Sequence, residues 1–140
     1  MRITIRATGN VDAATAWERY ERPALWPGWS PHLRSVTVDG PGDGPPADPR
    51  LAAGLTGRVH GPPGVWAAFT VLTVDAPAMR WSWRVTRGPL AVTLDHEVVT
   101  RAGGSSTSLT LRGPAPVITG YVPVAWYALH RLVTLEPDPA

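Results

Sequence analysis

The sequence contains no cysteine and no lysine, and all 13 of its basic residues are arginine. Lack of cysteine excludes a disulfide scaffold, a cysteine-bound zinc or iron–sulfur site and a thiol nucleophile. Lack of lysine, in a chain rich in Ala, Gly, Pro, Arg and Val, is typical of a GC-rich genome. The net charge is only +2, so the alkaline pI of 9.7 is a poor argument for nucleic-acid binding.

A long apolar run is also missing. Residues 1–6 alternate charged or polar with apolar residues, unlike a secretion signal or a membrane span, so we expect a cytoplasmic protein without a membrane-spanning segment. The 140 residues, of which 44% are hydrophobic and 17% charged, predict one domain over residues 1–140. A chain of this length buries roughly two thirds of its unfolded surface, enough for a core without metals or disulfides.

Alternation of apolar and polar residues predicts strands along most of the chain. Ile3, Ile5 and Ala7 mark the first strand. Asp12 then stands at an N-cap position before an amphipathic helix that Pro23 ends, and residues 23–31 have room for a second short helix. Six further strands are predicted, with a Gly/Pro loop at 40–49: residues 32–39, 55–60, 65–74, 79–87, 90–101 and 106–112.

The last segment, residues 117–135, changes to helical periodicity. Gly120 and Pro123 indicate either a kink or a helix that starts near Val122. The element order predicts an α+β fold, in which a curved antiparallel sheet of about seven strands wraps around a long C-terminal helix, with two short helices between strands one and two. One side of that helix is apolar: Ile118, Tyr121, Val122, Ala125, Leu129, Leu132 and Val133.

Several local phrases carry a resemblance: VDAATAWERY, LWPGWSPHLRSV, GLTGRV, RWSWRV and LDHEVVTRAGGSSTSLTL. Together they resemble the START/Bet v 1-like (SRPBCC) superfamily, in its bacterial polyketide cyclase/dehydrase-like branch, over essentially the whole chain. The resemblance implies a helix-grip fold with an interior pocket. Members bind lipids, polyketides, hormones and other hydrophobic molecules, and some catalyse cyclisation or dehydration. These segments are typical of the fold and do not carry a catalytic mechanism. No catalytic motif of the family aligns residue by residue with this sequence.

If each strand buries its more apolar side, one set of residues faces the pocket. The set is Phe69, Val71, Trp81, Trp83, Val85, Leu90, Val92, Leu94, His96, Val98, Leu109 and Leu111. From it we expect Phe69, Val71, Trp81, Trp83 and Leu94 to bind substrate, together with Ala125 of the terminal helix.

The 7 tryptophans need a large apolar space to fill or a surface on which flat ligands stack. Trp81 and Trp83, two apart on one strand, either form a wall for a flat ligand or fill the core. Trp26 and Trp29 either bind substrate at the pocket entrance or clamp the first helix. Trp66 has the opposite parity to Phe69 and either covers the outer face or marks a bulge.

His96 is the one polar residue on an apolar strand face, either satisfied in the core or available as donor, acceptor or general base. Its neighbours Asp95 and Glu97 point to the opposite face, so they cannot form a relay with it. Tyr121, on the inward side of the helix, can donate to a ligand carbonyl or simply pack its ring. His96 and Tyr121 are the two catalytic candidates, whereas Tyr127 and His130 are expected in solvent.

Other chemistries have little support in the sequence. The four histidines are widely spaced, and neither a phosphate loop nor a Gly-x-Ser-x-Gly elbow is present, so we expect no metal and no cofactor. The prediction is a monomer or homodimer that binds a hydrophobic, polyketide-like molecule. It either cyclises or dehydrates that molecule by templating its conformation, or carries it unaltered. Nucleic-acid binding through outward arginines is the weaker alternative.

Overall fold

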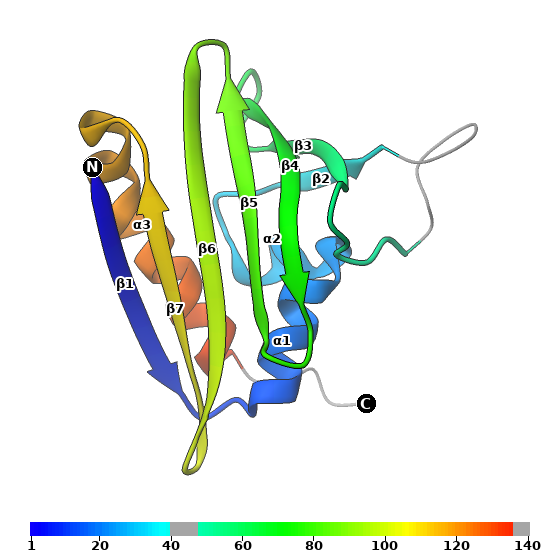
Figure 1. The fold of residues 1–140 in the computed structure, drawn as a ribbon, viewed down its shortest axis with the longest axis vertical. Helices are drawn as coiled ribbons and strands as arrows, with labels where there is room; N and C mark the ends of the chain where they lie inside the picture. Colours follow the sequence, from blue (N-terminus) through cyan, green and yellow to red (C-terminus); the bar gives the residue numbers. More distant parts are fainter. Residues whose placement is uncertain (40–47, 136–140) are drawn as a thin grey trace.

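Figure 1 shows the computed structural model, which describes residues 1–39 and 48–135. The observed elements follow the predicted order. The strands are β1 (Arg2–Gly9), β2 (Ser35–Val38), β3 (Thr56–His60), β4 (Trp66–Asp75), β5 (Arg80–Arg87), β6 (Leu90–Arg101) and β7 (Gly104–Arg112). The helices are α1 (Ala13–Glu21), α2 (Trp26–Trp29) and α3 (Ala115–Thr134), with a 3-10 turn, η1 (Pro23–Leu25), before α2.

The seven strands form one antiparallel sheet in the order β1-β7-β6-β5-β4-β3-β2. Helices α1 and α2 carry the chain from β1 at one edge of the sheet to β2 at the other. The sheet curves around α3, which packs against β1 and β7 (Figure 1). This is the helix-grip fold that the sequence predicts.

Two side-chain features define the ends of α1. Asp12 caps its start, because one carboxylate oxygen accepts from the Thr15 backbone N–H at 3.2 Å and the other from the Thr15 hydroxyl at 2.6 Å. These bonds favour the ionised form and lower the pKa of Asp12. The helix stops at Glu21, two residues before Pro23, which has no backbone N–H to continue it.

Helix α3 begins at Ala115, with Pro116 in its first turn and Pro123 inside it. A start near Val122 is therefore wrong: the Ile118 N–H already donates to the Pro114 carbonyl at 3.0 Å, which closes the first turn upstream. The predicted apolar side is buried or half-buried along the whole helix. In the described part of the chain, no helix is both long and apolar enough to cross a membrane.

Two predicted strand features differ from the structure. Strand β2 is shorter than residues 32–39, because the Leu33 N–H donates to the Ser30 carbonyl and makes a turn there. Leu90 is 46% exposed and not part of the core, because it pairs with Arg87 at the tip of the β5–β6 hairpin. Most of the predicted loop at 40–49, residues 40–47, lies outside the described residues.

Trp66 does not mark a bulge, and its ring has two arginine neighbours. The guanidinium groups of Arg58 and Arg87 lie 4.4 and 4.0 Å from its ring centre. The irregularity in β4 is elsewhere, between Val71 and Thr73.

The C-terminal end of α3 is fixed to both α1 and β1. The buried Arg19 guanidinium donates to the carbonyls of Leu132 at 2.7 Å and Leu135 at 2.5 Å, two of the acceptors that a helix end leaves unpaired. Burial lowers the pKa of Arg19. A Cβ on Gly9 would lie 2.1 Å from the Val133 carbonyl oxygen, so only glycine allows this approach of β1 to α3.

Candidate functional site

A cavity of about 280 Å³ lies between the inner face of the sheet and helices α2 and α3. Its lining residues divide by exposure into two groups. We call the buried group the closed half: Trp26, Trp29, Ser30, Val59, Trp81, Trp83, Leu94, His96, Leu109, Leu111, Ile118, Ala125, Ala128 and Leu129. We call the partly or fully exposed group the open half: His32, Leu33, Gly61, Val65, Trp66, Ala67, Val85, Val92, Val117 and Tyr121.

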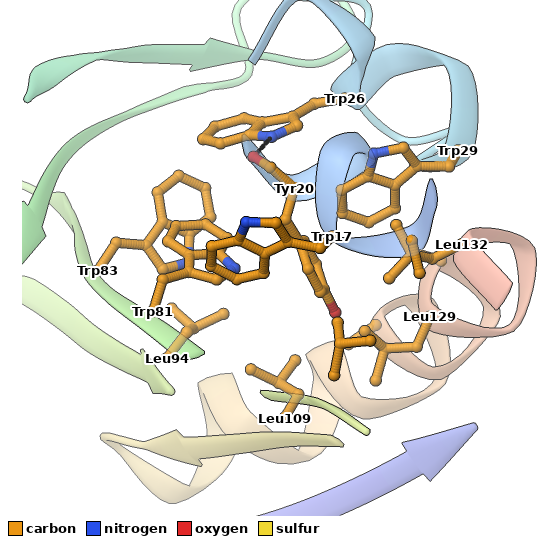
Figure 2. Packing of buried hydrophobic residues seen from close by; sticks show 14 of the residues in the cluster. Trp17, Tyr20, Trp26, Trp29, Trp81, Trp83, Leu94, Leu109, Leu129 and Leu132 are labelled. Atoms are coloured by element: carbon orange, nitrogen blue, oxygen red, sulfur yellow. Dashed lines mark hydrogen bonds between the residues drawn. The ribbon is translucent and has the colours of Figure 1, made fainter. Parts of the chain in front are cut away.

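Aromatic rings build the wall of the closed half (Figure 2). Trp81 and Trp83 project from β5, with ring centres 5.4 Å apart. Trp26 of α2 packs against both, at 5.7 and 5.0 Å. Tyr20 of α1 adds an edge-on contact to Trp81 at 5.6 Å. The three indoles contact one another and also line the cavity, so they act as both core and pocket wall, whereas Tyr20 supports them from behind.

Trp26 and Trp29 are held in place by the end of α1. The Trp26 indole N–H donates to the Tyr20 carbonyl at 2.9 Å, and that of Trp29 donates to the Arg19 carbonyl at 3.0 Å. Carbonyls in the last turn of a helix have no partner within it, so they are available as acceptors. Both indoles therefore clamp the first helix, and both also line the cavity.

His96 lies deep in the closed half and is only 7% exposed. Its ring stacks on Trp81, with centroids 4.2 Å apart and planes 10° from parallel, and contacts the edge of Tyr20 at 5.1 Å. Burial lowers the pKa of His96 to about 3, so it is neutral at physiological pH. Its neighbours Asp95 and Glu97 instead pair with Arg112 and Arg80.

Three ring nitrogens in this half have no hydrogen-bond partner among the described residues: Trp81 Nε1, Trp83 Nε1 and His96 Nδ1. All three are buried. An unsatisfied buried polar group costs about 1–3 kcal/mol, so such groups are rare in native structures and often mark a place for a further partner.

A hydrogen-bonded chain of three side chains runs from Ser30 of the closed half to His32 and Tyr121 of the open half. Ser30 Oγ lies 3.2 Å from His32 Nδ1, and His32 Nε2 lies 3.2 Å from the Tyr121 hydroxyl. Ser30 and His32 follow α2, whereas Tyr121 belongs to α3, so the chain links two separate walls of the cavity. Burial lowers the pKa of His32 and raises that of Tyr121 to about 12, which leaves both groups neutral near pH 7.

No lining residue carries a charge at neutral pH: the set contains no Asp, Glu or Arg, and both of its histidines have lowered pKa values. Within residues 1–39 and 48–135, no cluster of three His, Cys, Asp or Glu side chains has the spacing to hold a metal. The arrangement can enclose an apolar molecule and form hydrogen bonds with its neutral polar atoms.

The structure brings most of the predicted site residues together. The cavity is lined by His96, Tyr121, Trp81, Trp83, Leu94, Trp26, Trp29 and Ala125. Phe69 and Val71 do not line it. They are buried behind the wall, where Phe69 packs against Trp26 and Trp83 at 5.8 and 5.2 Å.

Sequence reasoning missed Ser30 and His32. They lie in a turn without strand or helix periodicity, and the partner of His32 is 89 residues away. The one available signal is that the phrase WSPH places a serine and a histidine directly after two tryptophans predicted near the pocket.

A family described as polyketide cyclase / dehydrase and lipid transport matches residues 1–133. The chain belongs to this family. The match covers every described helix and strand apart from the last residue of α3. No curated protein matches the sequence. Membership in the polyketide cyclase/dehydrase and lipid transport family supports a hydrophobic ligand for the cavity, and it leaves open whether that ligand is converted or carried.

Solved structures with low sequence identity share the fold. Ginseng major latex-like protein 151 from Panax ginseng has 10% identity and a TM-score of 0.75, with 94% of each chain covered. Ara h 8.0201 has 13% identity and a TM-score of 0.70, again with 94% of each chain covered. A protein from Nitrosospira multiformis has 14% identity and a TM-score of 0.70, covering 94% of this chain and 93% of its own. These are Bet v 1-like folds.

Proposed function

We propose that the protein binds a hydrophobic, polyketide-like molecule in the cavity and catalyses its cyclisation or dehydration without a cofactor. One observation carries the catalytic part: the His32–Tyr121 hydrogen bond of 3.2 Å, placed in an apolar cavity. The enclosing wall holds a flexible ligand in a reactive conformation and keeps water away. The polar pair then acts on a ligand oxygen or on a carbon next to it.

For a dehydration, neutral His32 takes a proton from the carbon beside a carbonyl, and Tyr121 donates its proton to the leaving hydroxyl, which departs as water. The proton on His32 then passes to the tyrosinate through their shared hydrogen bond, which restores both groups. The raised pKa of Tyr121, about 12, suits a proton donor that does not ionise on its own.

His96 takes a different role in this proposal. Its ring stacks on Trp81 and its pKa of about 3 makes it a very weak base. We assign His96 to the wall of the closed half, where its neutral imidazole orients the ligand.

A carrier function is the second candidate. It is favoured by the predominantly apolar lining, in which no residue is charged. A carrier releases its ligand chemically unaltered.

Two measurements test these functions. Native mass spectrometry of the purified protein, followed by extraction, identifies any bound molecule and its chemical class. Turnover is then measured with 4-hydroxy-4-phenylbutan-2-one, a β-hydroxyketone whose dehydration product absorbs in the near ultraviolet. We expect Tyr121→Phe and His32→Gln each to lower the rate at least a hundredfold.

Tyr127→Phe is the matched control, because Tyr127 is 48% exposed and does not line the cavity. It should retain the wild-type rate. Equal rates in Tyr121→Phe, His32→Gln and the wild type would overturn the catalytic assignment. Ligand binding without any conversion would support the carrier.

A further inference from the structure

The surface around the open half of the cavity combines exposed apolar side chains with arginines. We call it the mouth surface and define it by six residues: Arg34, Arg58, Val65, Trp66, Arg87 and Leu90. We propose that the mouth surface docks on a membrane that contains anionic phospholipids. The proposal goes beyond the proposed function and rests on it in one respect only, the passage of an apolar ligand between the lipid and the cavity.

Two hairpin turns form the centre of the mouth surface. Residues 61–65 join β3 to β4, and residues 88–89 join β5 to β6. The turns lie at the same end of the sheet, because the Arg87 guanidinium donates to the Trp66 carbonyl at 2.5 Å and Arg87 pairs with Leu90 (Figure 1). Val65 and Trp66 also line the cavity. The open half therefore lies beside both turns.

Each hairpin turn presents an aliphatic side chain to solvent. Val65 is 59% exposed and Leu90 is 46% exposed. The turn before Val65 is closed by two backbone hydrogen bonds of 2.8 Å, from the Gly61 N–H to the Val65 carbonyl and from the Val65 N–H to the Pro62 carbonyl. These bonds hold Val65 outside the core. Exposed aliphatic side chains that lie close together are typical of an interaction site, and short apolar protrusions can enter the interface of a bilayer.

Arginines surround these apolar side chains. Arg34, Arg58 and Arg87 are exposed, and none of the ion pairs among the described residues includes them. The guanidinium groups of Arg58 and Arg87 lie against the Trp66 ring. A guanidinium stacked on an indole keeps N–H groups in its plane, and these can bind the oxygens of a phosphate. Tryptophan and arginine are also the residues that anchor proteins at a membrane interface.

The charges at this end of the molecule have one sign. The segments that supply the open half contain no Asp or Glu, and their only formally charged side chains are arginines: residues 31–35, 58–67, 85–93 and 111–121. By contrast, Glu18 and Glu21 of α1 pair with Arg22 and Arg50. The mouth surface therefore complements an anionic partner, and α1 does not.

An anionic membrane fits these observations better than an acidic protein. A protein partner needs a continuous complementary surface, whereas the exposed aliphatic side chains here lie on two separate turns that can each enter a fluid interface. The cavity also opens beside these turns, so an apolar ligand dissolved in the lipid can reach it without crossing water.

Cosedimentation of the full chain with vesicles tests the docking. Vesicles of phosphatidylcholine with about 30% phosphatidylglycerol are compared with vesicles of phosphatidylcholine alone, in about 0.1 M salt. We expect the anionic vesicles to bind the protein at least about tenfold tighter, because each arginine near an anionic surface contributes about fivefold. Raising the salt to about 0.5 M should remove most of this difference.

Matched substitutions locate the docking surface. Arg58→Gln and Arg87→Gln should each weaken binding to anionic vesicles about fivefold, and Arg58→Lys and Arg87→Lys should restore most of it. The control is Arg101→Gln, which removes an exposed arginine at the other end of β6 and should bind like the wild type.

A second pair of substitutions tests the apolar contribution on a single strand. Leu90→Ser should weaken binding about fivefold. Val99→Ser changes a 38%-exposed residue near the far end of β6 and should have no effect. This pair keeps the proposal testable even where an arginine variant does not fold.

The outcomes separate docking from the proposed function, because vesicle binding is measured without ligand and turnover without vesicles. A protein that converts its ligand but does not bind anionic vesicles overturns the docking alone. A protein that binds vesicles but neither holds nor converts a ligand supports the docking and overturns the proposed function. Equal losses in the mouth variants and their controls overturn the assigned surface.

Soluble polyglutamate is the probe for an acidic protein partner. We expect it to bind at least about tenfold more weakly than the anionic vesicles, because it offers no apolar phase to Val65 and Leu90. If polyglutamate binds as tightly as the vesicles and Leu90→Ser weakens neither interaction, the membrane is overturned as the partner.

Discussion

The closed and open halves of the cavity use polar groups in opposite ways. In the closed half, three buried ring nitrogens lack partners, and a wall of interlocked rings surrounds them. In the open half, His32 and Tyr121 bond to each other, and His32 also bonds to the buried Ser30, so that the chain joins the segment after α2 to α3. The closed half therefore carries the cost of unpaired ring nitrogens, whereas the polar side chains of the open half already have partners.

The two halves should also differ in their contribution to stability, and this is the largest expected effect. Trp26→Ala removes a 2%-exposed indole that contacts Phe69, Trp81 and Trp83, so we expect a loss of about 3–5 kcal/mol in the free energy of unfolding. Val65→Ala, at a 59%-exposed position of the open half, should change it by less than about 0.5 kcal/mol. Urea unfolding measures the free energy of unfolding of both variants. Similar losses in the two would contradict the prediction that the closed half contributes more to stability.

The pH dependence of stability should come mainly from the closed half. The pKa of His96 is about 3 in the folded protein and 6.5 for a free histidine, so the unfolded chain takes up a proton first as the pH falls. Stability is therefore full above about pH 6.5 and is lost toward pH 3. We expect a loss of about 2 kcal/mol between pH 7 and 5.

We expect His96→Phe to flatten the dependence of the free energy of unfolding on pH. His32→Phe, which changes a half-buried residue of the open half, should leave most of that dependence in place. Urea unfolding at several pH values between 5 and 7.5 gives the slopes. An unchanged slope in His96→Phe would assign the pH dependence to other groups.

The smallest expected effect is the coupling within the open half. Tyr121→Phe removes the hydroxyl that bonds His32, and we expect it to lower the free energy of unfolding by about 1 kcal/mol. A double-mutant cycle with His32→Phe should give a coupling of about 0.5–1 kcal/mol. A coupling near zero would show that the two side chains act independently, and the proton transfer between them would lose its support.

The halves differ, too, in how well the sequence predicts them. Alternation along β5 and β6 correctly places Trp81, Trp83, Leu94 and His96 on the inner face, because strand periodicity determines which side a residue takes. Strand periodicity does not determine whether an inward side chain reaches the cavity or is covered by other side chains. Phe69 and Val71 were predicted to bind the ligand, but they are buried in the core and do not line the cavity. His32 has no such periodicity, and its role depends on a contact made only when α3 folds back.

The contacts of Arg19 and Gly9 hold one end of α3. The hydrogen bonds from Arg19, one buried and one part-buried, and a backbone approach that allows no Cβ hold its C-terminal turn. Near the other end, Tyr121 and Val117 border the open half, and the buried Ile118 and the His32–Tyr121 hydrogen bond hold the helix. We expect amide hydrogens around residues 117–121 to exchange with solvent faster than those around residues 129–133, and equal rates would show that both ends of the helix are held equally firmly.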